Sequence, residues 1–217
     1  MLSYKHGYHA GNHADVMKHI VLIYLYNLSK KHHKSISYID THSGSGKYDY
    51  KHDYMNKNKE YNLGIRKLDN YDGNNRLILN YLRILKKINF NKNYFYLGSP
   101  VIIANISDKN DRLNFCELHK NEYKNLKKNL NKFTNAKIYN EDGFKFIKKI
   151  KDKKKDYFIF IDPSYELKSD YEEIETLLDN YENNLIKQQV MIWYPVINLE
   201  EKDLFIEKIK KKGINNL

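Results

Sequence analysis

Short apolar runs alternate with stretches of helical spacing along most of the chain. Strands are predicted over residues 35–40, 112–118, 136–139, 157–161 and 189–193. Helices are predicted over residues 16–28, 75–88, 100–106, 119–131, 141–150, 171–183 and 199–212, with Asn12 or Asp15 as the cap of the first. Alternation at this spacing is typical of an α/β protein whose parallel sheet is covered on both faces.

One long segment interrupts the alternation. Residues 47–93 are polar and rich in Tyr and Asn, and their one clear amphipathic stretch is 75–88. We interpret 47–93 as an inserted, partly helical subdomain. Because the chain has no internal repeat and no flexible linker, we expect residues 1–217 to form a single domain around this insertion.

The charge balance points to a polyanionic partner without identifying it. Lys and Arg number 38 against 27 Asp and Glu, which gives a net charge of +11. Such a balance favours nucleic acid, because neutralised phosphates release counterions. The abundance of Lys, Asn, Ile and Tyr also fits an AT-rich coding bias, so charge alone leaves the question open.

The chain has the features of a cytoplasmic protein. Cys116 is the only cysteine, so no disulfide can form within the chain. The first residues are polar and rich in histidine, unlike a signal peptide, and no apolar run reaches the length of a membrane span. We therefore expect no membrane partner.

A glycine-containing turn follows the first predicted strand. Residues 41–46 read Thr-His-Ser-Gly-Ser-Gly, so Gly44 and Gly46 let the backbone pass close to a ligand. A dinucleotide site would need a third glycine where Asp49 stands, which favours a smaller nucleoside ligand. An ordinary tight turn between strand and helix is the alternative.

Acidic residues follow two further strands. Ligands of open parallel sheets bind beyond the carboxyl ends of the strands, so Glu117 is placed to accept both hydroxyls of a ribose. Asp142, followed by Gly143, is placed to accept a hydrogen bond from an adenine amino group. Taken alone, each carboxylate is equally compatible with a helix start.

The sharpest signal is the sequence Asp162-Pro163-Ser164-Tyr165 at the end of an apolar strand. An exocyclic base amine is a poor nucleophile, because its lone pair is delocalised into the ring. The Asp162 carboxylate and the Pro163 carbonyl would accept both N–H groups and direct the lone pair towards a methyl donor. Tyr165 would stack on the extruded base.

The N-terminal histidines do not favour a metal site. No Cys or carboxylate completes a ligand set at zinc spacing around them, so we predict no metal. Together with aromatic and basic neighbours they are more typical of an RNA-contacting surface or a cofactor lid, for which we single out Tyr4, His6 and Lys18.

The chain resembles the RlmJ family, methyltransferases that form N6-methyladenine in 23S ribosomal RNA. The most specific matches are at the start, in Met1 to His6, His9 to Val16, Lys18 and His19. Others follow in family order at Asp40 to His42, Gly44, Gly46, Gly98 to Pro100, Glu117 to His119, Asp142, Gly143, Asp162, Pro163, Tyr165, Glu166 and Trp193 to Pro195.

The resemblance implies a Rossmann-like methyltransferase fold with a small helical insertion. It implies that S-adenosylmethionine is the cofactor and that its contacts are His19, His42, Ser99, Glu117, Asp142, Gly143 and Asp162. It also implies that Asp162 is catalytic and that Tyr4 touches the RNA substrate. Nothing suggests more than a monomer.

Two positions depart from the family pattern. The family corner reads Asp-Pro-Pro-Tyr, and here Ser164 replaces the second Pro, which removes one fixed backbone dihedral. Activity is still expected, because Asp162, Pro163 and Tyr165 remain. Family members also continue into further strands after the last predicted helix, whereas this sequence ends at Leu217, so we expect those strands to be missing.

Two other functions remain open at this point. A DNA adenine-N6 methyltransferase would share the Asp-Pro-x-Tyr corner, although the opening histidine-rich segment argues against it. A non-catalytic RNA-binding remnant of the family would retain the basic surface without the chemistry.

Overall fold

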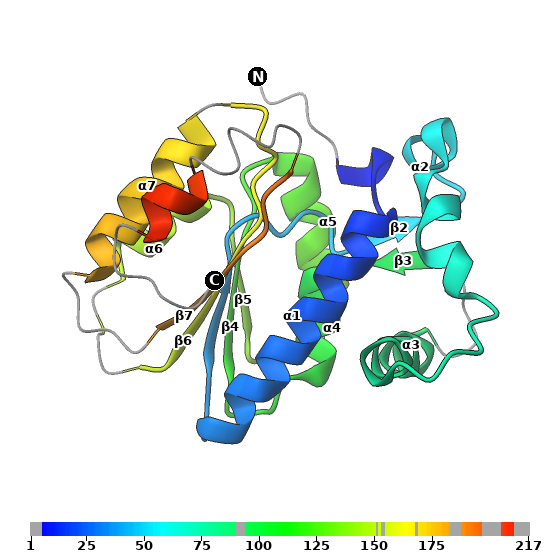
Figure 1. Cartoon of the computed structure of the whole chain (residues 1–217), viewed down its shortest axis with the longest axis horizontal. Coiled ribbons are helices and arrows are strands. Elements are labelled where there is room, and N and C mark those ends of the chain that lie inside the picture. The colour runs from blue at the N-terminus through cyan, green and yellow to red at the C-terminus, as the bar shows by residue number, and fades with distance from the viewer. Residues whose placement is uncertain are drawn as a thin grey trace.

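The computed structural model describes residues 6–89, 94–150, 152, 155–167, 169–182, 188–196 and 205–210. Its centre is a five-stranded, wholly parallel sheet with the order β5-β4-β1-β6-β7 (Figure 1). The strands are β1 (Ser37–Asp40), β4 (Arg112–Cys116), β5 (Ala136–Tyr139), β6 (Tyr157–Ile161) and β7 (Gln188–Ile192). This confirms the predicted α/β class, and the strand order is that of a Rossmann-like sheet.

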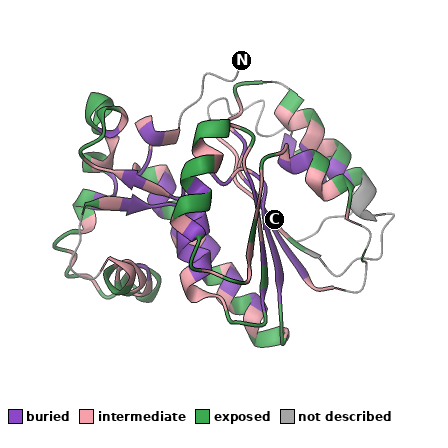
Figure 2. Ribbon diagram, turned by 180° about the vertical axis from the view of Figure 1, so that it is seen from behind, coloured by how far each residue is buried: buried purple, intermediate pink, exposed green. Residues whose placement is uncertain are grey.

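The middle strands are buried on both faces, which explains their continuous apolar sequences. Every residue of β1 and β6 is buried. Along β6, Phe158 and Phe160 enter the hydrophobic cluster on one face, while Ile159 and Ile161 enter the cluster on the other. Figure 2 shows the buried residues concentrated along the sheet.

Helices cover both faces of the sheet (Figure 1). On one side lie α1 (His13–His32), α4 (Ser99–Ile106) and α5 (Lys120–Leu130). On the other lie α6 (Gly143–Lys148), α7 (Ser169–Glu182) and the helical residues 205–210. No helix in the described part of the chain combines the length and apolar character needed to cross a membrane.

The longest helix begins where a cap was expected. Asn12 is the N-cap of α1, and its side chain accepts a hydrogen bond from the Asp15 N–H at 2.9 Å. The helix is one turn longer than predicted at its C-terminal end. Its last turn contains Lys30, Lys31 and His32, and positive charge is stabilised there by the negative end of the helix dipole.

The segment after the glycine turn forms a small unit beside the sheet. Two short antiparallel strands, β2 (Lys47–Asp49) and β3 (Phe95–Leu97), form its base. Between them lie α2 (Asp53–Asn58), the 3-10 turns η2 (Glu60–Leu63) and η3 (Ile65–Leu68), and α3 (Arg76–Ile88). The pairing of β2 with β3 was not predicted, because three residues of mixed polarity carry no periodic signal.

This unit is attached to the start of the chain. The 3-10 turn η1 (His6–Tyr8) precedes α1, and His9 Nδ1 lies 2.9 Å from Glu60 Oε1. The Ile65 N–H donates to the Gly11 carbonyl at 2.9 Å. A Cβ on Gly64 would lie 2.1 Å from that same carbonyl oxygen, so only glycine permits this close approach.

The remaining differences from the predicted elements are at their ends. β1 begins two residues later than predicted, and β4 ends two residues earlier, at Cys116. Of the predicted helix 199–212, residues 205–210 are helical, and 199–204, 211 and 212 lie outside the described residues. In the described part of the chain β7 is the last strand.

A buried carboxylate holds the edge of the sheet at which β1 and β4 begin. Asp111 is 2% exposed and accepts hydrogen bonds from the Tyr26 hydroxyl, the Ile36 N–H and the Asp108 N–H, each at 2.8 Å. These bonds join α1 to the starts of β1 and β4, where the backbone would otherwise lack partners.

We predict that Asp111→Ala lowers the free energy of unfolding by about 3 kcal/mol or more, because it leaves buried donors unpaired. Urea denaturation measures this change. The matched control is Asp69→Ala, which removes an exposed partner of Arg66 and should cost less than about 1 kcal/mol. Equal costs for the two variants would contradict the role given to Asp111.

Candidate active site

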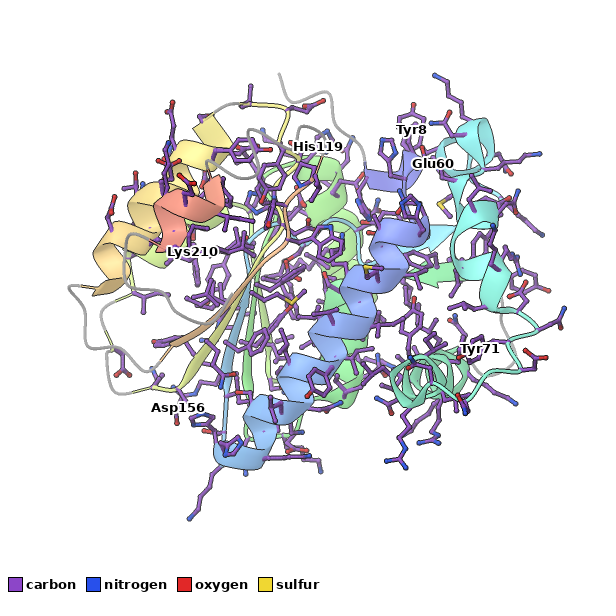
Figure 3. The ribbon with its side chains drawn as sticks, in the orientation of Figure 1. Tyr8, Glu60, Tyr71, His119, Asp156 and Lys210 are labelled. Carbon is purple, nitrogen blue, oxygen red and sulfur yellow. The ribbon has the colours of Figure 1, made fainter. Side chains whose placement is uncertain are left out.

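The carboxyl ends of the parallel strands meet at one edge of the sheet. In the register of the sheet, Asp40 lies beside Phe115 on one side and Phe160 on the other, so β1, β4 and β6 end nearly level. His119 is near this edge and Asp156 is at the opposite edge (Figure 3). The predicted site residues that follow these strands therefore come together, as expected for ligand binding in open parallel sheets.

The turn over 41–46 is held tightly at this edge. The Thr41 N–H donates to the Phe160 carbonyl at 3.1 Å, and the Ser43 N–H donates to the Cys116 carbonyl at 2.9 Å. Gly44 and Gly46 have φ angles of +59° and +75°, which side chains rarely adopt. The backbone conformation of the turn is therefore enough to explain why glycine occupies both positions.

Glu117 binds this turn directly. Its Oε2 accepts a hydrogen bond from the Gly44 N–H at 2.8 Å, and its Oε1 accepts one from the His119 N–H at 2.6 Å. Burial raises the pKa of Glu117 despite these two bonds. Each oxygen has a second lone pair, so the carboxylate can hold the turn and still accept from a ligand.

A second carboxylate lies beneath the turn. Asp40 is fully buried, and its Oδ2 accepts a hydrogen bond from Ser99 Oγ at 2.8 Å. The His42 N–H donates to its Oδ1 at 3.3 Å. Burial, reinforced by the nearby charge of Asp162, raises the pKa of Asp40 from 3.8 to about 7. Ser99, predicted as a cofactor contact, thus lies at the site edge bound to Asp40.

Two predicted cofactor contacts are neutral imidazoles. Burial lowers the pKa of His19 to about 3, and its Nδ1 is hydrogen-bonded to the Tyr96 hydroxyl at 2.8 Å. Burial lowers the pKa of His42 to about 4, and its ring packs edge-on against Phe144. Neutral rings supply one donor and one acceptor each, without adding positive charge to the site.

Lys18 joins the first helix to the Asp-Pro-Ser-Tyr corner. Its Nζ lies 2.7 Å from Asp15 Oδ1 and 2.6 Å from Asp162 Oδ2. Burial opposes the charge of Lys18, but these two carboxylates outweigh it and raise the pKa of the ammonium above its usual value. Within the described residues Asp162 Oδ1 has no hydrogen-bond partner, so it is available to a ligand.

The other residues predicted to contact RNA lie beside this group or outside the described part. His6 Nε2 is 2.9 Å from Asp15 Oδ2, so His6 is connected to Lys18 through a shared carboxylate. Burial raises the pKa of Asp15, but His6 and Lys18 outweigh it and hold that pKa well below its usual range. Tyr4 lies outside the described residues.

The corner after β6 is rigid in spite of Ser164. Pro163 is buried, and Tyr165 has a φ of +55°, which is strained for an aromatic residue. The Tyr165 hydroxyl donates to the Trp193 carbonyl at 2.6 Å, and its ring packs against that of Tyr171. The bond to Trp193 ties the corner to the residue that follows β7.

Asp142 and Gly143 have structural roles at the same edge. Asp142 is the N-cap of α6, where its Oδ1 accepts a hydrogen bond from the Lys145 N–H at 3.1 Å. A Cβ on Gly143 would lie 2.2 Å from the Thr41 carbonyl oxygen. Gly143 therefore lets the start of α6 pack directly against the turn, and Asp142 keeps its Oδ2 for another donor.

A buried polar atom at this edge is unpaired within the described part of the chain. His119 Nδ1 has no hydrogen-bond partner among the described residues, whereas the backbone N–H of His119 is bonded to Glu117. Buried polar groups are normally paired, so an orphan beside Glu117 is consistent with a polar ligand at this place. The described residues contain no group of three or more His, Cys, Asp or Glu that could hold a metal ion.

The sequence did not single out two residues that organise this site. Asp15 was considered as a helix cap, yet it binds His6, Lys18 and the Gly11 N–H, the last at 3.0 Å. Asp15 lies three residues before Lys18 on a predicted helix, and this spacing could have indicated an ion pair between the two side chains. Asp40 was noted only as one residue of the segment Asp40 to His42 that resembles the family. Its burial depends on the packing of the whole sheet, so the sequence did not indicate it.

Comparisons with known proteins agree with this geometry. A family model described as ribosomal RNA large subunit methyltransferase D, RlmJ, matches residues 33–217. The ribosomal RNA large subunit methyltransferase J of Haemophilus influenzae is 34% identical over 220 residues, and that of Escherichia coli is 31% identical over 219. Each comparison covers 100% of this chain and 78% of the relative.

A solved structure has the same fold. The crystal structure of a protein from Legionella pneumophila superposes on this chain with a TM-score of 0.78 and 35% sequence identity. The superposition covers 94% of this chain and 76% of the other.

The raised pKa of Asp40 predicts a pH dependence of stability. A carboxyl group that binds its proton more tightly when folded favours the folded state at low pH. Its contribution to the free energy of unfolding therefore falls as the pH rises from about 4 to about 7. Urea denaturation of the protein and of Asp40→Asn should show the difference between them changing across this interval and level outside it. Parallel profiles would contradict the burial of an ionisable Asp40.

Proposed function

Because the chain belongs to the RlmJ family of ribosomal RNA large subunit methyltransferases, we propose that it methylates the exocyclic N6 amine of an adenine in 23S ribosomal RNA. The methyl donor is S-adenosylmethionine. The observation that carries this proposal is the position of Asp162 near His42 of the glycine turn: its Oδ1 has no hydrogen-bond partner among the described residues, while Lys18 holds its Oδ2 at 2.6 Å. A structural ion pair alone gives no reason to place an open carboxylate oxygen at a ligand-binding edge.

The chain has the groups that a nucleoside cofactor needs. Glu117 would accept from the ribose hydroxyls with the lone pairs that Gly44 and His119 leave free. Asp142 would accept from the adenine amino group, and the glycine turn brings backbone N–H groups close to the ligand. The other contacts proposed are His19, His42, Ser99, Gly143 and Asp162. When bound, the cofactor supplies an electrophilic methyl group.

Asp162 and Pro163 would orient the target amine. Asp162 Oδ1 accepts one N–H of the amine and the Pro163 carbonyl accepts the other, so the nitrogen lone pair points at the methyl group. The amine nitrogen becomes cationic only after it has attacked, and Asp162 would take its proton late in the step. Most of the acceleration would come from this proximity and orientation.

Lys18 would position Asp162 for this role. An ammonium with two fixed carboxylates cannot follow Asp162 into another rotamer without breaking its contact with Asp15. Tyr165 is tied to Trp193 through its hydroxyl, so its ring would form a fixed stacking surface for the extruded adenine. Tyr4 and His6 would contact the RNA near the same place.

We predict that Asp162→Ala lowers kcat for methyl transfer by about 100-fold or more, because the amine loses its acceptor. The fold should persist, since Lys18 keeps its contact with Asp15. The measurement is incorporation of labelled methyl groups into unmodified 23S RNA, with duplex DNA as the alternative substrate and Asp69→Ala as a variant of an exposed carboxylate. Near-wild-type turnover in Asp162→Ala, or a preference for DNA, would refute the assignment.

We predict that Glu117→Ala weakens binding of S-adenosylhomocysteine by about 30-fold or more, corresponding to the loss of about 2 kcal/mol of charge-assisted hydrogen bonding. Titration calorimetry measures the dissociation constant. Glu122→Gln is the control, because Glu122 binds Ser45 of the same turn and Gln can accept that bond. Unchanged affinity in a folded Glu117→Ala variant would mean that the cofactor is not held at this carboxylate.

A further inference from the structure

The helix that follows Glu117 has two chemically different sides. One side of α5 packs on the glycine turn: Glu122 accepts a hydrogen bond from Ser45 Oγ, and the Asn129 amide donates to the Ser45 carbonyl at 2.8 Å. Leu126 lies fully buried between them. This side is therefore committed to holding the turn at the candidate cofactor site.

The other side of α5 is a row of lysines. Lys120, Lys124, Lys127 and Lys128 follow the spacing i, i+4, i+7 and i+8, which places them within about 100° of arc on one face of a helix. All four are exposed, and none forms an ion pair with any residue in the described part of the chain. We call these four residues the α5 lysine face.

The stretch of sequence that contains α5 is rich in positive charge and poor in negative charge. Residues 112–140 contain seven Lys and Arg, and the acids among them are Glu117 and Glu122, both engaged at the turn. Unpaired like charges at this density repel one another, so the surface gains free energy when a polyanion covers it.

The helix α7, on the other face of the sheet, is acidic. The sequence of α7 contains six Asp and Glu and no Lys or Arg. Two of its acids are paired with lysines of neighbouring helices, with Lys148 Nζ 2.6 Å from Glu173 and Lys208 Nζ 2.8 Å from Glu175. The helices α5 and α7 lie on opposite faces of the sheet (Figure 1), so a polyanion is attracted to the helix α5 and repelled by the helix α7.

We propose that the α5 lysine face is the docking surface for the phosphate backbone of the RNA substrate. The inference deepens the proposed function, on which it rests for the identity of the polyanion. The α5 lysine face begins at Lys120, directly after His119, which lies near the carboxyl edge of the sheet (Figure 3). The face therefore starts next to the candidate active site and extends away from it along α5. Phosphates on this face would position the RNA and carry no base specificity.

The test compares charge-neutralised variants in RNA binding. The quadruple variant K120Q/K124Q/K127Q/K128Q removes the α5 lysine face, and K145Q/K148Q/K149Q/K208Q removes four lysines beside α7 as the matched control. A third variant, R76Q/R83Q/K86Q/K87Q, removes the cations of α3. Binding of an unmodified 23S RNA transcript is measured for each over a range of salt concentrations, and methyl transfer is measured in parallel.

The α5 variant should reduce the slope of log K against log salt by about 3, since it loses four phosphate contacts and each contact contributes about 0.7 to 0.9. It should raise KM at least about tenfold and leave kcat unchanged, because the contacts are equal in the ground and transition states. The control should change the slope by less than about 1. An unchanged slope in the α5 variant, or an equal change in the control or the α3 variant, would overturn the proposal.

The two proposals fail separately. If the protein methylates the RNA but the α5 variant binds it like the original, the docking surface is wrong and the proposed function stands. If the protein transfers no methyl group to RNA while its RNA binding depends on α5, the docking surface stands and the proposed function is wrong.

Discussion

The site depends above all on one buried ammonium. Lys18 is 6% exposed and lies within 2.7 Å of two carboxylates that are 147 positions apart in sequence, Asp15 in the first helix and Asp162 after β6. The two carboxylates compensate the charge of this buried ammonium, which would be costly to bury alone, so the three groups hold one another in place. These contacts therefore constrain the first helix together with the corner after β6, and His6 joins them through Asp15.

The rest of the carboxyl edge is built around this constraint. The glycine turn is fixed from two sides, by Glu117 through the Gly44 N–H and by α5 through Ser45. Asp40 lies beneath it, and the close packing of Gly143 against Thr41 brings the start of α6 to the same place. A nucleoside cofactor and a base amine thus find an edge whose donors and acceptors are already oriented, which is the condition for catalysis by orientation.

Periodicity predicted most of the fold, whereas the organisation of the site required the structure. The buried strand 157–161 and the helix 75–88 have strong, unbroken patterns and were placed correctly. The pairing of β2 with β3 and the attachment of the inserted unit through Gly11 and Gly64 depend on contacts between distant segments, which no local pattern encodes. For the same reason Asp162 was proposed from its motif and Lys18 as an RNA contact, but the ion pair between them was not predicted.

The central claim is that this edge of the sheet methylates adenine N6 in ribosomal RNA. The most direct measurement is mass spectrometry of nucleosides from unmodified 23S RNA incubated with the protein and S-adenosylmethionine. The account predicts close to one N6-methyladenosine per RNA molecule, and at most a few per cent of that in the same time when Asp162 is replaced by Ala, in line with the loss of about 100-fold or more in kcat. Absence of N6-methyladenosine with a folded, cofactor-binding protein, or a methyl group on another base, would contradict it.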